Sequence, residues 1–173
     1  MTSTFTVVTP SSHAAERLFD LSLSIDEHLG SMATSGEQAI GGVTSGLIGL
    51  GETVTWRARH FGIWFTMTSQ ITEHDRPRRF VDEQIAGPFR SFRHVHDFSS
   101  EVHGSAEAGL ATAGGNLTEG STMTDTITVT SPLFGRLAER LKLVPYLRRL
   151  IRQRSRHLLA VLDAEATAQR QKK

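Results

Sequence analysis

Hydrophobic and polar residues alternate with a period of two through the middle of the chain, between residues 37 and 130. Such alternation places every second side chain on the same face of a β-strand. Glycine and proline pairs divide this stretch, so the pattern predicts about six consecutive antiparallel strands joined by hairpins. The predicted strands cover residues 37–45, 52–60, 63–72, 80–86, 89–98 and 121–130, and a short run at Phe5–Thr9, ended by Pro10, precedes them.

The same parity predicts which side chains face inward. In the clearest strand, 121–130, a row of threonines takes one face and apolar residues with one aspartate take the other. The inward set expected to contact a ligand is Trp56, His60, Phe65, Met67, Asp82, Gln84, Phe92, His94, His96, Met123 and Asp125.

Helical spacing appears at both ends of the chain. The N-terminal part predicts two short helices, one after Ser11 or Ser12 and one between Leu23 and Gly36. From Leu133 onward, leucines and isoleucines recur at spacings of three, four and seven, which predicts one long C-terminal helix. Pro145 is expected to kink or split it. Residues 99–119, rich in glycine, serine and alanine, are predicted to be a flexible loop, and 169–173 a frayed tail.

These elements predict an α+β fold in a single domain spanning residues 1–173. The apolar face of the sheet needs a partner, and the C-terminal helix is the long amphipathic element that can cover it. A strongly curved sheet wrapped around one helix leaves room for an internal cavity.

Composition narrows the chemistry. The chain has no cysteine, which excludes disulfides, a thiolate nucleophile and zinc sites built on sulfur. No signal peptide or membrane-spanning stretch is evident, so we expect a cytoplasmic protein.

The net charge of +1 conceals a basic segment between Leu133 and His157. We interpret its arginines, from Arg148 to Arg156, as a solvated helix face, with contact to a protein or an anionic membrane as the alternative. No nucleic-acid recognition motif accompanies them.

One group of inward residues can carry chemistry. A tight turn at Gly87-Pro88 would set Asp82 opposite His94 and Gln84 opposite Phe92, with His96 and Asp125 beside them. A buried carboxylate needs a hydrogen-bonding or cationic partner, so these residues form either a structural network or a site that orients a ligand. As acid–base catalysts, the candidates are His94, His96 and Asp125.

Metal and nucleotide sites have less support. Alternate strand residues can chelate one ion, so His94 and His96 with Asp82 or Asp125 are a conceivable site. No other ligand spacing is present, and we assign no metal and no cofactor. The glycines of residues 46–51 do not have the dinucleotide-binding spacing, and a strand follows them.

Several stretches resemble the START-like (SRPBCC) superfamily, and within it polyketide cyclase/dehydrase-type ligand-binding proteins. They are 42–51 (GVTSGLIGLG), 54–62 (VTWRARHFG), 80–84 (FVDEQ) with 87–89 (GPF), and 92–96 (FRHVH). The resemblance extends from Phe5 to about Leu162 and implies the helix-grip fold.

Three functions follow as hypotheses. The resemblance favours binding of a small hydrophobic molecule (a lipid, polyketide or aromatic metabolite) between the sheet and the C-terminal helix. The alternatives are a cyclase/dehydratase-type enzyme using the cavity His and Asp residues, and an accessory protein that contacts a protein or membrane through its basic helix. The sequence leaves open whether the protein is an enzyme and what its oligomeric state is.

Overall fold

The structure is a computed structural model that describes residues 2–103, 118–131 and 142–172. In chain order the elements are β1 (Thr2–Ser11), α1 (Ala15–Ser22), α2 (Ile25–Ser31), a short 3-10 helix η1 (Ala33–Ser35), β2 (Gln38–Gly42), β3 (Thr53–His60), β4 (Ile63–Asp75), β5 (Arg79–Ala86), β6 (Ser91–His103), β7 (Thr118–Thr130) and α4 (Val144–Gln171). The predicted order of a strand, two short helices, a run of strands and a long helix is confirmed.

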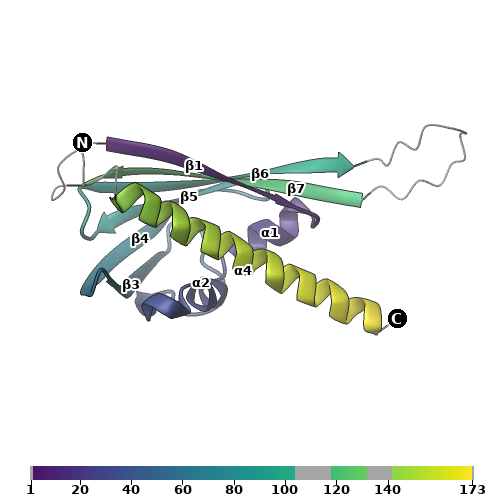
Figure 1. Cartoon of the computed structure of the whole chain (residues 1–173), viewed down its shortest axis with the longest axis horizontal. Helices are drawn as coiled ribbons and strands as arrows, with labels where there is room; N and C mark the ends of the chain where they lie inside the picture. The colour runs from purple at the N-terminus through teal and green to yellow at the C-terminus, as the bar shows by residue number, and fades with distance from the viewer. Residues whose placement is uncertain (1, 104–117, 132–141, 173) are drawn as a thin grey trace, which may run out of the picture.

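The strands form one antiparallel sheet in the order β1-β7-β6-β5-β4-β3-β2. Strands β2 to β7 follow one another as a meander, and β1 pairs with the last strand, from Thr2 opposite Thr130 to Ser11 opposite Ser121. The register of β4 against β5 shifts twice, at Thr68/Ser69 and at Ile71/Glu73. Such bulges bend a strand, and the sheet curves around α4, which crosses its concave side (Figure 1).

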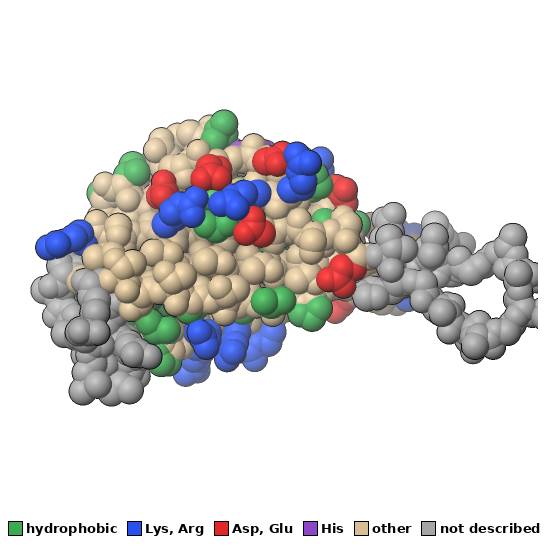
Figure 2. Space-filling view, turned by 90° about the horizontal axis from the view of Figure 1, so that it is seen from above, with side chains coloured by type: hydrophobic (Ala, Val, Ile, Leu, Met, Phe, Trp, Pro, Cys, Tyr) green, Lys and Arg blue, Asp and Glu red, His purple; other side chains and the backbone are tan. Residues whose placement is uncertain are grey.

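The outer face of the sheet is polar. Threonine pairs join β1 to β7, including Thr2 with Thr130 and Thr4 with Thr128. Farther along the sheet Glu73 accepts from Arg79 and from Arg93, and Figure 2 shows intermixed acidic and basic side chains on this face. The polar outer face leaves the concave side as the place where apolar side chains gather.

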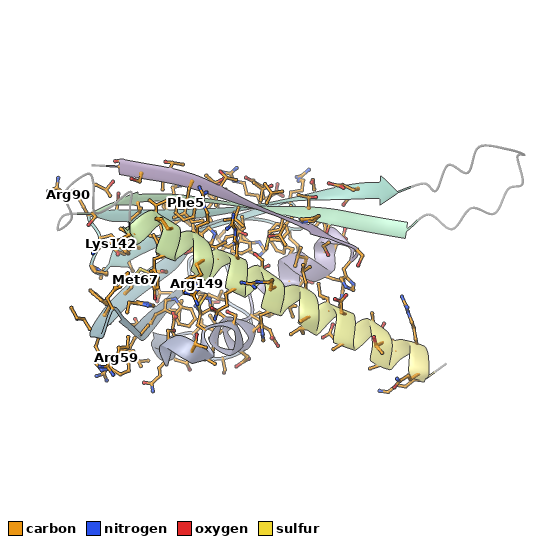
Figure 3. The ribbon with its side chains drawn as sticks, in the orientation of Figure 1. Phe5, Arg59, Met67, Arg90, Lys142 and Arg149 are labelled. Carbon is orange, nitrogen blue, oxygen red and sulfur yellow. The ribbon has the colours of Figure 1, made fainter. Side chains whose placement is uncertain are left out.

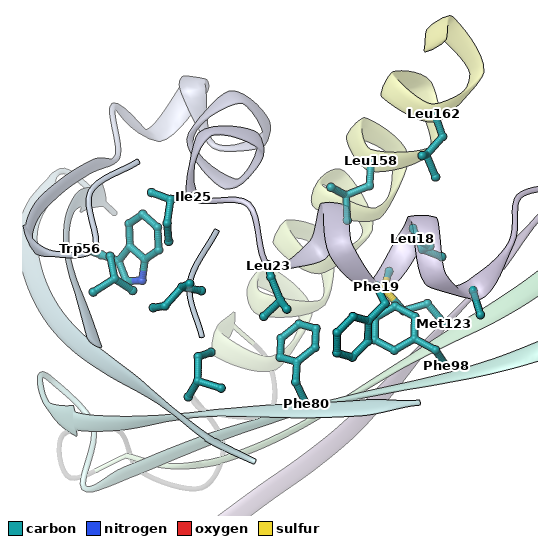
Figure 4. Close-up of a cluster of buried hydrophobic side chains, with 14 residues drawn as sticks. Leu18, Phe19, Leu23, Ile25, Trp56, Phe80, Phe98, Met123, Leu158 and Leu162 are labelled. Carbon is teal, nitrogen blue, oxygen red and sulfur yellow. The ribbon is translucent and has the colours of Figure 1, made fainter. Parts of the chain in front are cut away.

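The main core lies where α1 and α4 meet the sheet. Phe19 of α1 is fully buried and makes edge-to-face contacts with Phe80 and Phe98 at centroid distances of 5.5 and 5.2 Å. Leu158 of α4 covers the same cluster from the other side (Figure 4). This packing closes one part of the space between helix and sheet and leaves the part beside β3 and β4 less filled.

The structure corrects several element boundaries. Pro10 does not end the first strand, because β1 lies at the edge of the sheet, where a missing backbone donor is tolerated. The first helix is not capped by a serine, since Ala14 is its N-cap and no side chain caps it.

The ends of β6, β7 and α4 also differ from the predictions. Strand β6 extends to His103 and β7 begins at Thr118, so both enter the predicted loop of 99–119, and its remainder lies outside the described residues. Pro145 lies in the first turn of α4, where its missing N–H leaves no intrahelical bond unmade. Helix α4 continues to Gln171, into the predicted tail, whereas predicted helical residues 133–141 lie outside the described residues.

Candidate functional site

A cavity of about 530 Å³ lies between the concave side of the sheet and α4. Its walls are mainly apolar side chains from α2, β3, β4 and α4, among them Ile25, Val54, Met67, Leu147 and Ile151. Figure 3 shows Met67 of β4 in the space between the strands and α4. Pockets that bind small organic molecules have volumes of about 300–1,000 Å³ and similar linings.

Most of the residues predicted from parity to contact a ligand line this cavity. They are Trp56, His60, Phe65, Met67, Asp82, Phe92, His94 and His96. The cavity also reaches Phe61 and Ile63 at the β3–β4 hairpin, where both side chains are largely exposed. The hairpin therefore forms part of the rim of the cavity.

Three predicted residues do not line the cavity. Gln84 folds back on its own turn, where its amide donates to Phe89 O and accepts from Phe89 N, and the β5–β6 pairing ends at Glu83 and Arg93. Met123 faces inward but packs in the core, where its sulfur accepts from Ser22. Asp125 is fully buried behind two histidines.

The predicted His/Asp residues form one cluster on β5, β6 and β7. Asp82 pairs with His94 across the β5–β6 ladder, and His96 pairs with Asp125 across the β6–β7 ladder. His94 Nε2 lies 2.9 Å from Asp125 Oδ1, and His96 Nε2 lies 3.1 Å from Asp82 Oδ2. His96 Nδ1 lies 2.8 Å from Asp125 Oδ1 without the alignment of a hydrogen bond, and His94 Nδ1 lies 3.6 Å from Asp82 Oδ2.

The environment of the cluster determines its protonation. Burial alone would raise the pKa of Asp125, but the hydrogen bond with His94 and the proximity of His96 hold it well below its usual range. Burial likewise opposes ionisation of Asp82, yet the bond with His96 and nearby positive charge lower its pKa. Burial lowers the pKa of His94, which is therefore neutral near pH 7. Because its Nε2 faces a carboxylate, Nε2 carries the proton and Nδ1 is an acceptor.

One arginine near the cluster is not predicted by the sequence pattern. Arg154 was placed on the solvated face of the helix, but it is buried, lines the cavity and donates from Nη2 to Ser22 O at 2.6 Å. Its Nη1 has no hydrogen-bond partner among the described residues. The signal available in the sequence was its spacing of four from Leu158, since both residues occupy the inner face of α4.

Two more polar pairs line the cavity away from the cluster. His60 Nδ1 lies 2.7 Å from the hydroxyl of Tyr146, and burial lowers the pKa of this histidine. His28 stacks on Trp56 at 4.2 Å between ring centroids and lies 3.2 Å from Glu37. The polar atoms of these side chains are largely hydrogen-bonded to one another. Few of them are left to bind a ligand, so this wall of the cavity is less polar than its residue composition implies.

The structure also tests the other binding sites considered from the sequence. Among the described residues, Asp82, His94 and His96 form a group whose ligand atoms all lie within 4.8 Å of one another, so these three could hold a metal ion. In the glycine-rich segment the amides of Gly46 and Gly49 donate to the carboxylates of Asp26 and Glu52. Those amides are already engaged and do not form a phosphate cradle.

Comparison with known proteins identifies the fold but no close relative. No protein-family model matches the chain, and no curated protein matches it. Solved structures do match. The chain is similar to the protein TTHA0849 from Thermus thermophilus, with a TM-score of 0.64 and 16% identity over 92% of this chain and 99% of that one. It is also similar to Ara h 8.0201, with a TM-score of 0.57 and 12% identity over the same shares.

No helix in the described ranges has the length and apolar character needed to cross a bilayer.

The curved antiparallel sheet, the two short helices after β1 and the long helix α4 agree with the two similar solved structures. The chain therefore has the helix-grip fold expected from the sequence, with an antiparallel sheet curved around a long C-terminal helix.

Proposed function

We propose that this protein binds a small, largely apolar molecule, such as a lipid, a polyketide or an aromatic metabolite, in the cavity between its sheet and α4. The cavity of about 530 Å³ is the observation that carries the proposal. Water in contact with its aliphatic and aromatic side chains can form few hydrogen bonds. An apolar ligand that replaces this water is therefore favoured. We expect the protein to act in the cytoplasm, and the absence of cysteine is compatible with a reducing compartment.

The polar cluster at one end suggests how a ligand is oriented. Asp82 and His94 present acceptors to the cavity, and Ser69 Oγ is buried without a hydrogen-bond partner among the described residues. A ligand with one polar end would satisfy these atoms while its body contacts the apolar wall. Such a site fixes orientation through a few polar groups and draws affinity from apolar contact.

The first experiment is native mass spectrometry of the purified protein, followed by extraction and identification of any bound molecule. In parallel, an uncharged fluorescent probe such as N-phenyl-1-naphthylamine should bind and be displaced by the extracted compound. Met67→Trp, which puts a larger side chain into the cavity, should weaken probe binding at least tenfold, about 1.4 kcal/mol. The matched control is Thr66→Trp on the exposed outer face of the same strand, which should leave binding unchanged.

Equal effects of the two tryptophan variants would contradict binding in the cavity, as would a protein that binds neither the probe nor any member of a lipid and aromatic panel. Circular dichroism of both variants checks that they are folded.

An enzyme of cyclase/dehydratase type is the second candidate, because a neutral His94 with a free Nδ1 acceptor lines the cavity beside an ionised Asp82. This pair could remove a proton next to a ligand carbonyl, as the ring closure of a poly-carbonyl chain requires. His94→Gln should then abolish turnover while the substrate still binds within about tenfold of the parent affinity. Loss of affinity and turnover together would favour a binding role alone.

The basic face of α4 supports a contact function as a third candidate. Arg149, Arg152 and Arg156 are exposed at spacings of three and four, which places them on one side of the helix. Binding to phosphatidylserine vesicles that fades with salt, and is lost in an Arg149→Glu/Arg152→Glu variant, is the expected result. Binding that does not depend on salt or on these arginines would exclude this contact.

A further inference from the structure

Three potential metal ligands converge at the inner end of the cavity. Asp82 Oδ2 lies 3.1 Å from His96 Nε2 and 3.6 Å from His94 Nδ1. Ligand atoms bound at about 2.0–2.2 Å around a tetrahedral zinc ion lie roughly 3.3–3.6 Å from one another. The two separations from Asp82 are therefore close to those that one ion imposes on its ligands.

The far sides of both imidazoles are held by a single carboxylate. Asp125 Oδ1 lies 2.9 Å from His94 Nε2 and 2.8 Å from His96 Nδ1. A histidine that binds a metal usually donates its other N–H to a carboxylate, which sets the tautomer and the orientation of the ring. His94 Nδ1 is then left as a lone pair on the side of Asp82, whereas His96 Nε2 is hydrogen-bonded to Asp82 Oδ2 in this structure. A metal ion at His96 Nε2 would replace that hydrogen bond and leave the ring proton on Nδ1, which lies 2.8 Å from Asp125 Oδ1.

The charges of the cluster favour a cation in this position. The cluster contains two carboxylates, Asp82 and Asp125, and Arg154 of α4 lies nearby. Arg154 forms no ion pair within 4.0 Å of either carboxylate among the described residues, and its Nη2 is bound to Ser22 O. A buried carboxylate is costly without a compensating charge, and a divalent cation between Asp82 and the histidines would supply one.

The side facing the cavity remains open. Asp82 retains 20% of its side-chain exposure, and it lines the cavity together with His94 and His96. Three protein ligands with an open fourth position characterise zinc sites that bind exogenous molecules, whereas closed structural sites use four protein ligands.

We propose that Asp82, His94 and His96 bind a divalent metal ion of the zinc type, with Asp125 orienting both histidines and the open position directed into the cavity. The fourth ligand would be water or an oxygen atom of a cavity-bound molecule, such as a carbonyl or hydroxyl. This proposal does not depend on which apolar molecule the cavity holds.

The test uses the metal alone, without any organic ligand. The full-length protein is stripped with chelator and titrated with Co²⁺, and binding is followed by visible d–d absorption and by native mass spectrometry. We expect one Co²⁺ per chain, an absorption typical of four-coordinate cobalt, and displacement by Zn²⁺. Asp82→Asn should weaken binding at least tenfold, and Asp125→Asn by about 10–100-fold through loss of ring orientation.

Matched controls separate this site from surface histidines. His28→Gln removes another cavity-lining histidine, and His13→Gln removes one that contacts Asp163 at the surface. Both variants should bind Co²⁺ like the parent. If Asp125→Asn does not fold, Asp82→Asn decides the matter, because Asp82 is only partly buried.

The proposal is overturned if the stripped protein binds no Co²⁺, or if the Asp82→Asn variant binds Co²⁺ as tightly as the parent. Because the assay contains no apolar ligand, such a failure leaves cavity binding intact, and a failure of cavity binding leaves the metal site intact.

Discussion

Replacing Asp125 with asparagine removes the one charge that two buried imidazoles share. Asp125 has no exposed surface, and its Oδ1 lies 2.9 Å from a nitrogen of His94 and 2.8 Å from one of His96. A hydrogen bond to a charged group contributes about 1.5–3 kcal/mol, and Asp125 accepts one from His94 and lies against His96. Asparagine keeps a neutral oxygen that can still accept one hydrogen bond, worth about 1 kcal/mol. We therefore expect a loss of about 2 kcal/mol in the free energy of unfolding.

Urea denaturation followed by far-UV circular dichroism measures this loss. With a slope of about 2 kcal/mol per molar urea, the midpoint should fall by about 1 M. The control is Asp163→Asn, which also removes a carboxylate paired with a histidine, but one that is 68% exposed. Its effect should stay within about 1 kcal/mol. If the two variants lose the same stability, the cost of burying the Asp125 charge cancels its contacts, and the reasoning fails.

Three smaller predictions concern the scaffold, each measured by the same denaturation assay. Phe19→Ala should cost about 3–5 kcal/mol, because it empties a fully buried site between α1 and the sheet; a loss below about 2 kcal/mol would mean that the core relaxes into the space. Gly42→Ala should cost about 1–3 kcal/mol or more, because a Cβ would lie 2.0 Å from Thr53 O at a φ of +71°. Gly36→Ala, at a φ of +61° with open space around it, should cost less, and the reverse order would contradict the argument. The hydrogen bond from Arg76 lowers the pKa of Asp20, so this pair stabilises the fold above the unfolded-state pKa of about 4, and its contribution is lost as the pH falls below that value. Asp20→Asn should cost under about 1 kcal/mol at pH 7 and less at pH 2, and an undiminished cost at pH 2 would refute the assignment.

Most of the correct predictions of inward-facing side chains rest on strand parity. The alternation around His94 and His96 placed both rings on the concave side, and the turn at Gly87-Pro88 set Asp82 opposite His94. Parity says only which face a side chain occupies, not how deep it lies. It therefore could not distinguish His94, which lines the cavity, from Asp125, which lies behind it.

The positions of Arg154 and Gln84 could not be predicted from local sequence patterns. An arginine in a basic helical segment is usually solvated, and the helix must be packed on the sheet before it is clear which arginine faces inward. Gln84 has inward parity, but its amide hydrogen-bonds the backbone of Phe89 and leaves the cavity wall. Neither outcome follows from periodicity, because each depends on contacts between side chain and backbone formed only in the folded chain.

The pairing of β1 with β7 has a consequence for biosynthesis. The first strand emerges from the ribosome roughly a hundred residues or more before its partner, since Ser11 pairs with Ser121 and Thr2 with Thr130. At translation rates of about 5–20 residues per second, β1 waits roughly 5–25 s with its backbone groups unpaired. Contacts so distant in sequence also slow folding, because a long loop must close before they form. The nascent chain therefore exposes an unpaired, β-prone segment until β7 and then α4 have been synthesised.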